Sequence, residues 1–296
     1  MREISWKRFG YHVVYDVDIY DAIDFSSKHG FGYIVPDLMV PRFFPERFSQ
    51  QERRRIREFA ASKNVSISFH GPSDYLNLGS LYPEVRQAVL DRMKLCLDFA
   101  RAVGAERFTI HIDPPFDFVF AGRKGTYLKD HWSMYEDALK QSLLELAEHS
   151  RGDVLVCVEN DRLSRLAMGV LDELLQTGKL FLTWDIPKSH TITGEPIVDM
   201  ENFLMRHLEK VKECHLHGQK PRKYSHDIIG VGKISFSRYL KMLVPQDVHF
   251  TLEIRPREDA LKSLKILKEM LGKLGWRISA HPGSTGTSSM KMPRPS

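Results

Sequence analysis

The chain has 296 residues, 42% of them hydrophobic, and a formal net charge of +5. This length can bury one large core, because a barrel domain of parallel strands needs roughly 250 residues. The apolar runs are shorter than the roughly 18 residues of a membrane span, and the polar start of the chain is unlike a secretory leader. The sequence therefore predicts a cytoplasmic protein without a membrane partner, and the mild positive charge gives only weak support for an acidic partner.

The three cysteines lie far apart inside apolar segments, at Cys96, Cys157 and Cys214. This spacing contains no CxxC pair and no even framework of the kind that forms disulfides or thiolate zinc sites. We expect all three to be reduced core residues.

Eight short runs rich in β-branched and aromatic residues alternate with longer amphipathic segments. We expect the strands at residues 11–15, 33–38, 65–70, 108–112, 154–159, 181–185, 213–217 and 248–254. We expect the helices at residues 19–29, 50–63, 83–103, 132–149, 165–176, 200–212, 235–243 and 259–274. The clearest helix begins at Pro83, which suits a first helical turn, and Gly104 ends it.

Alternating strands and helices predict an α/β fold, a single-domain (β/α)₈ TIM barrel over residues 1–278, because right-handed crossovers place every helix outside the sheet. An open doubly wound sheet is the alternative, but no expected strand is followed by GxGxxG. Residues 279–296 are rich in Ser, Pro, Gly and Thr and have no periodicity, which predicts a disordered tail or a cloning remnant.

Residues that can bind a metal stand at or just beyond the carboxyl ends of six expected strands, where barrel enzymes build their sites. These residues are, in chain order, His70, His111, Glu159, Asp185, His215 and Glu253. Because side chains alternate along a strand, His217 shares a face with His215, and Arg255 shares one with Glu253. A single strand-end histidine is more often structural than a ligand. A glutamate inside an apolar strand is costly unless it is paired or metal-bound, so Glu159 and Glu253 are the most informative positions.

The combination of carboxylates and imidazoles without thiolates predicts a divalent-metal cofactor, with manganese, magnesium, cobalt, iron and zinc all compatible. The complete set of candidate ligands is Glu159, Asp185, His215, Glu253, His226, His70, His111 and His190.

This pattern resembles the xylose-isomerase-like barrel superfamily, which contains sugar isomerases, epimerases and dehydratases together with the endonuclease-four class of abasic-site nucleases. The resemblance covers about residues 11–274 and is most specific in residues 70–80, HGPSDYLNLGS. It implies that Glu159, Asp185, His215 and Glu253 hold one metal ion. It also implies a further histidine before a Gly-x-Gly turn, which matches His226 before residues 230–232.

The nuclease members use up to three zinc ions, and their additional ligands match His70 and His111. They place a histidine three residues after the aspartate of strand six, where this chain has Lys188 and the nearest histidine is His190. They also place an aspartate two residues before the last histidine, where this chain has Tyr224. The resemblance thus implies an incomplete three-zinc site.

Three functions remain open. The first is a metal-dependent isomerase or epimerase acting on a sugar or sugar-like substrate, in which the metal stabilises an enediolate while Glu159 and Glu253 exchange a carbon-bound proton, assisted by His70. The residues expected to bind that substrate are His111, His217, Lys220 and Arg255. The second is a zinc phosphodiesterase acting on abasic DNA, the one hypothesis with a nucleic-acid partner. The third is a non-catalytic binding barrel. The sequence leaves the oligomeric state open.

Overall fold

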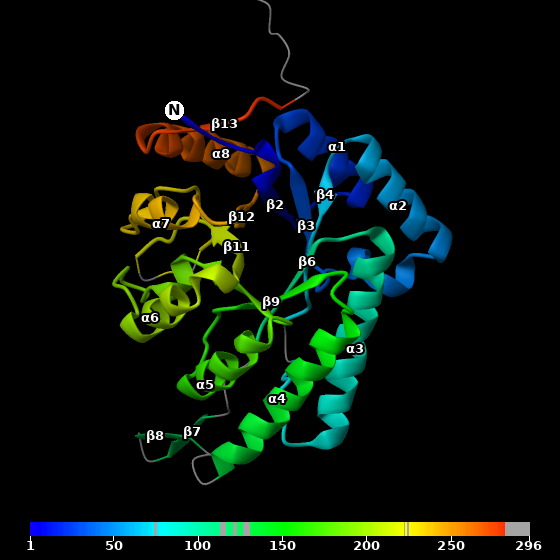
Figure 1. The fold of residues 1–296 in the computed structure, drawn as a ribbon, viewed down its shortest axis with the longest axis vertical. Helices are drawn as coiled ribbons and strands as arrows, with labels where there is room; N and C mark the ends of the chain where they lie inside the picture. The colour runs from blue at the N-terminus through cyan, green and yellow to red at the C-terminus, as the bar shows by residue number, and fades with distance from the viewer. Residues whose placement is uncertain are drawn as a thin grey trace, which may run out of the picture.

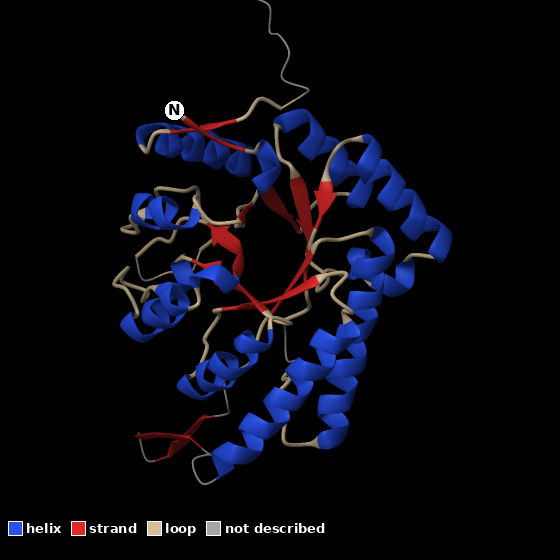
Figure 2. Ribbon diagram, in the orientation of Figure 1, coloured by secondary structure: helices blue, strands red, loops and turns tan. Residues whose placement is uncertain are grey.

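The computed structural model describes residues 1–73, 76–112, 117–120, 123–126, 131–221, 223 and 225–281. A ring of parallel strands lies at its centre and helices surround the ring (Figures 1 and 2). The strands of the ring are β2 (Phe9–Val13), β3 (Tyr33–Pro36), β4 (Ser66–Ile67), β5 (Phe69–His70), β6 (Arg107–Ile110), β9 (Leu155–Glu159), β10 (Phe181–Asp185), β11 (Val211–Leu216) and β12 (His249–Leu252). The helices are α1 (Ile19–His29), α2 (Gln50–Ser62), α3 (Pro83–Val103), α4 (Trp132–His149), α5 (Arg165–Leu174), α6 (Val198–Arg206), α7 (Phe236–Leu243) and α8 (Arg257–Lys273).

The ring closes through a strand that is divided at Ser68 into β4 and β5. β4 pairs with β3, whereas β5 pairs with β6. The backbone N–H of Leu38 donates to the carbonyl of His70 at 2.9 Å, which continues the β3 side of the closure. The order β4-β3-β2-β12-β11-β10-β9-β6-β5 therefore returns to its starting strand, and the predicted TIM barrel is confirmed.

Helix boundaries follow from residues that satisfy the free backbone groups at helix ends. Ser49 and Glu52 form a reciprocal capping box at the start of α2. Pro83 occupies the first turn of α3, and Gly104 ends this helix with φ of 73°. That left-handed conformation costs little for glycine because no Cβ collides with the backbone.

The structure differs from the expected elements in three places. We predicted a helix over residues 200–212, but α6 ends at Arg206 and Val211 pairs with Leu182 as the start of β11. The hydrogen bonds of the sheet thus override a helical pattern that continued into the strand. The pattern also missed the parallel pair of β1 (Arg2–Ile4) and β13 (Trp276–Ile278), which lies beside α8 (Figure 1), and the antiparallel pair of β7 (Asp117–Phe120) and β8 (Arg123–Thr126).

The end of the described chain is attached to its beginning. The N–H of Ser279 donates to the carbonyl of Ile4 at 2.9 Å, and the N–H of Trp6 donates to the Ser279 hydroxyl at 3.0 Å. The tail expected from residue 279 remains a prediction for residues 282–296, which lie outside the described residues.

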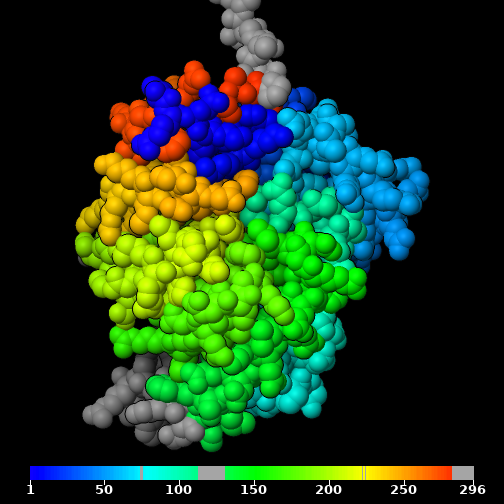
Figure 3. All heavy atoms as spheres, viewed as in Figure 1, coloured from blue at the N-terminus to red at the C-terminus, as the bar shows by residue number. Residues whose placement is uncertain are grey.

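Side chains fill the space that the ribbons enclose, so the barrel is a packed core rather than a pore (Figure 3). Cys96, Cys157 and Cys214 are buried with free thiols, as expected for core residues. Among the described helices, none is both long and apolar enough to cross a membrane.

Gly32 provides a test of the packing at the amino ends of the strands. A Cβ built at this position would lie 2.2 Å from the Cα of Lys7, and backbone cannot move aside as a flexible side chain can. We expect Gly32→Ala to lower the free energy of unfolding by about 2 kcal/mol or more, measured by urea denaturation followed by circular dichroism. The control is Gly169→Ala in α5, where the added Cβ has no neighbouring atom within contact distance. This substitution should stabilise the protein by about 0.5–1 kcal/mol, because alanine favours a helix more than glycine does. Equal stability of Gly32→Ala and wild type would contradict the close approach.

Candidate metal centre

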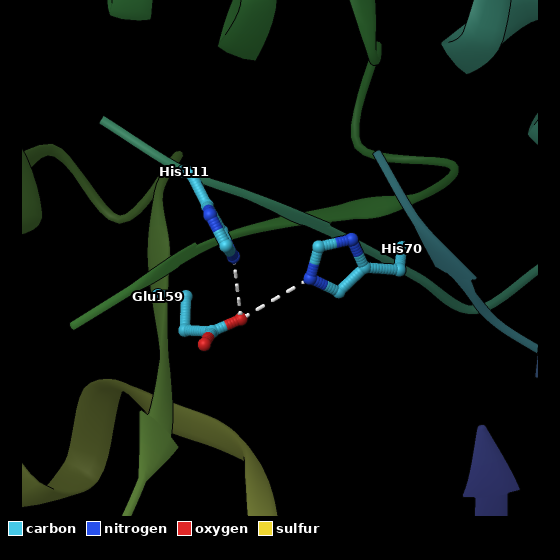
Figure 4. A group of neighbouring side chains, drawn as sticks. All are labelled: His70, His111 and Glu159. Carbon is cyan, nitrogen blue, oxygen red and sulfur yellow. Dashed lines mark hydrogen bonds and ion pairs between the residues drawn. The ribbon is translucent and has the colours of Figure 1, made fainter. Parts of the chain in front are cut away.

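The carboxylate of Glu159, the last residue of β9, lies completely buried at the carboxyl end of the barrel. Its Oε2 atom is 3.3 Å from His70 Nε2 and 3.0 Å from His111 Nε2. The two imidazoles approach this single oxygen from different directions (Figure 4). A third imidazole, that of His215 on β11, places its Nδ1 atom 3.4 Å from the same oxygen. Three strands therefore direct imidazoles at one carboxylate.

A second carboxylate approaches the same nitrogen of His215. Glu253 follows β12, and its Oε2 atom is 3.8 Å from His215 Nδ1 and 3.3 Å from His226 Nε2. Asp185 ends β10, and its Oδ2 atom is 3.3 Å from His217 Nε2. The closed barrel thus collects carboxylates from β9, β10 and the end of β12 around imidazoles from β11, as the positions of these residues at the strand ends predicted.

Within the described residues, the side chains form three groups whose potential ligand atoms all lie within 4.8 Å of one another. The groups are His70, His111 and Glu159; Glu159, Asp185 and His215; and His217, His226 and Glu253. Imidazole nitrogen with carboxylate oxygen is the ligand set that manganese, iron, cobalt and zinc accept. Glu159 belongs to two of the groups.

Unsatisfied polar atoms indicate that these residues fit a metal ion. Both ring nitrogens of His215 and the Oε2 atom of Glu253 are buried and have no hydrogen-bond partner among the described residues. A buried polar atom without a partner costs about 1–3 kcal/mol. His215 Nδ1 lies 3.8 Å from Glu253 Oε2 and 3.4 Å from Glu159 Oε2, so a divalent cation among these atoms would satisfy His215 Nδ1 and Glu253 Oε2 together, whereas His215 Nε2 faces Glu213. Glu159, Asp185, His215 and Glu253 are the residues that would hold the cation.

The electrostatics of the cluster also favour a cation. Burial by itself lowers the pKa of His70 and of His215, but the carboxylates around them outweigh burial and raise these pKa values to about 9 and about 10. Burial likewise opposes ionisation of Glu159 and Glu253. Lys188 and histidines nevertheless hold the pKa of the Glu159 carboxyl well below its usual range, and His226, His215 and His12 do the same for Glu253. A site that attracts protons to its imidazoles attracts a metal cation for the same reason.

Lys188 brings a permanent positive charge into this cluster. It lies in the short 3₁₀ turn Pro187–Ser189 that follows β10, and its Nζ atom is 2.7 Å from Glu159 Oε1 and 3.7 Å from Asp161 Oδ2. Burial opposes its charge, but the neighbouring carboxylates, Glu159 foremost, outweigh burial and raise the pKa of Lys188 above its usual value. The ammonium is therefore protonated at neutral pH.

Buried hydrogen bonds fix the turn that carries Lys188. Its own backbone N–H donates to Asp185 Oδ1 at 3.0 Å. The hydroxyl of Ser189 accepts from the indole N–H of Trp184 at 2.8 Å and from the side-chain amide of Asn160 at 3.1 Å. The position of the ammonium is thus determined by the ends of β9 and β10.

Two of the predicted site residues are not brought to the cluster. His190 uses Nδ1 at 2.8 Å from the Ile186 carbonyl and Nε2 at 3.1 Å from the Tyr239 hydroxyl, so the structure does not support its expected role as a ligand. His190 was expected only as the histidine nearest to the position where the nuclease members carry a ligand, and it follows the 3₁₀ turn Pro187–Ser189, after which its ring contacts Tyr239. Lys220, expected to bind substrate, is exposed and its Nζ atom is 2.9 Å from Asp227 Oδ1. Tyr224 lies outside the described residues.

The remaining predicted substrate-binding residues do lie at the cluster. His111 contacts Glu159, and its Nδ1 atom is 3.4 Å from Asp161 Oδ2. His217 belongs to one of the ligand groups. The guanidinium of Arg255 contacts the His12 ring and lies 4.0 Å from Glu253 Oε1.

Sequence reasoning missed His12 in β2 and Asp37 directly after β3. His12 Nδ1 is 3.4 Å from Glu253 Oε1, and His12 Nε2 is 3.5 Å from Asp37 Oδ2. Burial outweighs the effect of these carboxylates and lowers the pKa of His12 to about 4, so the ring is neutral at physiological pH. The position of His12 and Asp37 at the ends of the first two barrel strands was the sequence signal that could have identified them as site residues.

Glu213, two residues before His215, was also missed. This fully buried carboxylate places its Oε1 atom 3.7 Å from His215 Nε2. It accepts hydrogen bonds from the hydroxyls of Thr251 and Thr109, and Arg107 Nε lies 3.9 Å away. A carboxylate behind a ligating imidazole fixes the orientation of the ring and increases its basicity.

Comparison with known proteins agrees with this geometry. The family described as xylose isomerase-like TIM barrel matches residues 23–270. An uncharacterized protein of Methanocaldococcus jannaschii is 24% identical over 260 residues, which cover 77% of this chain and 88% of that protein.

Solved structures share the fold. A D-tagatose 3-epimerase-like protein has a TM-score of 0.72 and 20% identity, covering 90% of this chain and 98% of that chain. The 3-keto-D-glucoside 4-epimerase of E. coli has a TM-score of 0.66 and 14% identity, covering 90% and 99% of the two chains. Endonuclease IV of Thermus thermophilus has a TM-score of 0.63 and 19% identity, with coverage of 90% and 99%.

Removal of the Glu213 charge tests its support of His215. We expect Glu213→Gln to weaken binding of Mn²⁺ or Zn²⁺ by about 10- to 100-fold, because the imidazole loses both orientation and basicity. Isothermal titration of chelator-treated protein measures the change. Glu209→Gln is the matched control, since Glu209 is exposed in the 3₁₀ turn Leu208–Lys210 that precedes β11. Unchanged affinity in a folded Glu213→Gln protein would show that Glu213 does not support the ligand.

Proposed function

We propose that this chain, which belongs to the xylose isomerase-like TIM barrel family, is a divalent-metal-dependent isomerase or epimerase acting on a sugar or sugar-like substrate. The observation that carries the proposal is the pair of buried carboxylates that approach the same nitrogen of one imidazole. Glu159 Oε2 lies 3.4 Å and Glu253 Oε2 lies 3.8 Å from His215 Nδ1. Two ionised carboxylates beside a shared cation site are suited to exchange of a carbon-bound proton.

The residues divide the work as follows. A bound divalent cation supplies Lewis acidity, which stabilises the negative charge that develops when a proton leaves the carbon next to a carbonyl. Glu159 and Glu253 are held ionised by their neighbours, so either can accept that proton. If one carboxylate removes the proton and the other takes up a proton from solvent and delivers it to the opposite face, the carbon is epimerised, and the first carboxylate then releases its proton to solvent. If the proton returns to the neighbouring carbon, the product is the isomeric aldose or ketose.

The surroundings of the carboxylates suit a small polyhydroxylated molecule. His70 and His111 present imidazole nitrogens that can orient hydroxyl groups, and the Lys188 ammonium can bind an oxygen with partial negative charge. A cavity of about 230 Å³ opens beside the cluster and is lined by Tyr11, His12, Asp16, Arg255 and Arg257, among others. The Nε atom of Arg255 is buried without a partner within the described part of the chain, which supports a role of Arg255 in binding substrate oxygens.

A second candidate function is cleavage of abasic DNA by a zinc site of the endonuclease IV type. The intact group of His70, His111 and Glu159 favours it, as does the similarity in fold to endonuclease IV. Lys188 argues against it, because an ammonium stands where that class has a further histidine ligand. Cleavage of a duplex with one abasic site, at a rate comparable to that of proton exchange on sugars, would favour the nuclease over the isomerase.

Exchange of Glu253 for glutamine tests the isomerase proposal directly. We expect Glu253→Gln to reduce proton exchange by at least about 100-fold, because the amide cannot accept the proton. Deuterium incorporation from D₂O into a panel of ketoses and aldoses, followed by NMR with Mn²⁺-loaded or Mg²⁺-loaded protein, measures the rate. Metal content is determined in parallel, so that loss of the base is distinguished from loss of the ion.

The control for this substitution is Glu269→Gln, an exposed glutamate of α8. It should retain the wild-type exchange rate. Full exchange activity in Glu253→Gln would exclude Glu253 as the base and leave Glu159 as the candidate.

A further inference from the structure

We infer that the Lys188 ammonium occupies a second cation position of this centre, so that the chain binds one divalent ion although its side chains form several ligand groups. This inference rests on the metal dependence within the proposed function and adds the number of ions and the residue that sets it. It is carried by the contacts of Glu159, by the rigid attachment of Lys188 and by the placement of charge.

Glu159 is the ligand for which two ions would compete. It supplies the carboxylate of the group with His70 and His111, and it is also part of the group with Asp185 and His215. Two ions bound at once in these two groups would therefore need both of its oxygens. Its Oε1 atom accepts from Lys188 Nζ at 2.7 Å, while Oε2 alone faces the three imidazoles. One side of the carboxylate is thus already bound to a cation.

The ammonium cannot easily give up this position. The backbone of Lys188 is anchored to Asp185, and Ser189 beside it is hydrogen-bonded to Trp184 and Asn160. The side chain is only 21% exposed, and its second acidic neighbour, Asp161 at 3.7 Å, lies on the same side as Glu159. Displacement into solvent would leave Glu159 Oε1 buried without a partner, which is costly for a carboxylate.

Repulsion between like charges then limits the number of divalent ions that the centre binds. A divalent ion held by Asp185, His215, Glu253 and the free side of Glu159 shares this carboxylate with one ammonium. A further ion at His70 and His111 would add two positive charges next to the first ion and the Lys188 ammonium. Repulsion between such close charges is strong where water is excluded. The imidazoles of His70 and His111 consequently remain available to the substrate.

The number of bound ions tests the inference without any measurement of activity. Chelator-treated wild type, Lys188→His and Lys188→Arg are titrated with Zn²⁺, desalted and analysed by elemental mass spectrometry, with circular dichroism as the check of folding. We expect one ion per chain for wild type and for Lys188→Arg, which keeps the cation. We expect two ions for Lys188→His, which removes the charge and adds a ligand.

A matched control and a second variant keep the outcome decisive. Lys179→His adds a histidine at an exposed lysine that contacts Glu148 outside the cluster, and it should bind no additional ion. Lys188→Met removes the charge without adding a strong ligand, and it should bind a second ion at least about tenfold more tightly than wild type. If Lys188→His does not fold, the affinity of Lys188→Met for a second ion tests the inference instead.

Two ions in wild type, or two in Lys188→Arg, would overturn the inference and leave the metal-dependent function standing. A single ion in folded Lys188→His, or no gain in affinity for Lys188→Met, would also overturn it. Wild type without any bound ion would instead remove the metal dependence itself, and the inference with it.

Discussion

A fully buried carboxylate at the end of β9 is the constraint on which the mouth of this barrel depends. An unpaired charge at the position of Glu159 would cost several kcal/mol, so the surrounding strands must supply compensating groups. Imidazoles come from β5, from the residue after β6 and from β11, and an ammonium comes from the turn after β10. Removal of any one of them would leave the others to neutralise the same charge, and the cluster therefore acts as a unit.

The layer beneath the cluster explains how the cluster keeps its shape. Hydroxyls of Thr109 and Thr251 bind Glu213, and the Tyr33 hydroxyl lies 2.8 Å from Thr251 Oγ1. The bonds of Thr109 with Glu213 and of Tyr33 with Thr251 cross the interior of the barrel and connect strands that are not neighbours in the sheet. His215 stands directly above this polar layer, so its ring is supported from within the core and not by a flexible loop. Sites built on rigid elements hold their geometry more closely than sites built on loops.

Several parts of the fold and of the site could be predicted because simple physical rules apply to them. Alternation along parallel strands and the cost of a buried charge placed six candidate ligands at the strand ends, and the family resemblance selected Glu159, Asp185, His215 and Glu253 among them. His12 was missed because the first strand begins at Phe9, two residues earlier than expected, so its end was misplaced. His190 was expected among the ligands because it is the histidine nearest to the position where the nuclease members carry one, but it follows a turn and its ring contacts Ile186 and Tyr239 instead. Lys188 shows a further limit, since the reach of a long flexible side chain is not contained in residue spacing.

The closure of the ring also affects the order in which the strands pair as the chain folds. β2 and β12 pair directly, with Tyr11 opposite Leu252, although most of the chain lies between them. Contacts of such large sequence separation form late, because the intervening chain must already be arranged. Ligands from β9, β10 and β11 can gather while the ring is open, but Glu253 arrives only with the last barrel strand. Capture of a metal ion by the complete set is thus coupled to the final step of folding, and the ion would preferentially stabilise the finished protein over its partly folded precursors.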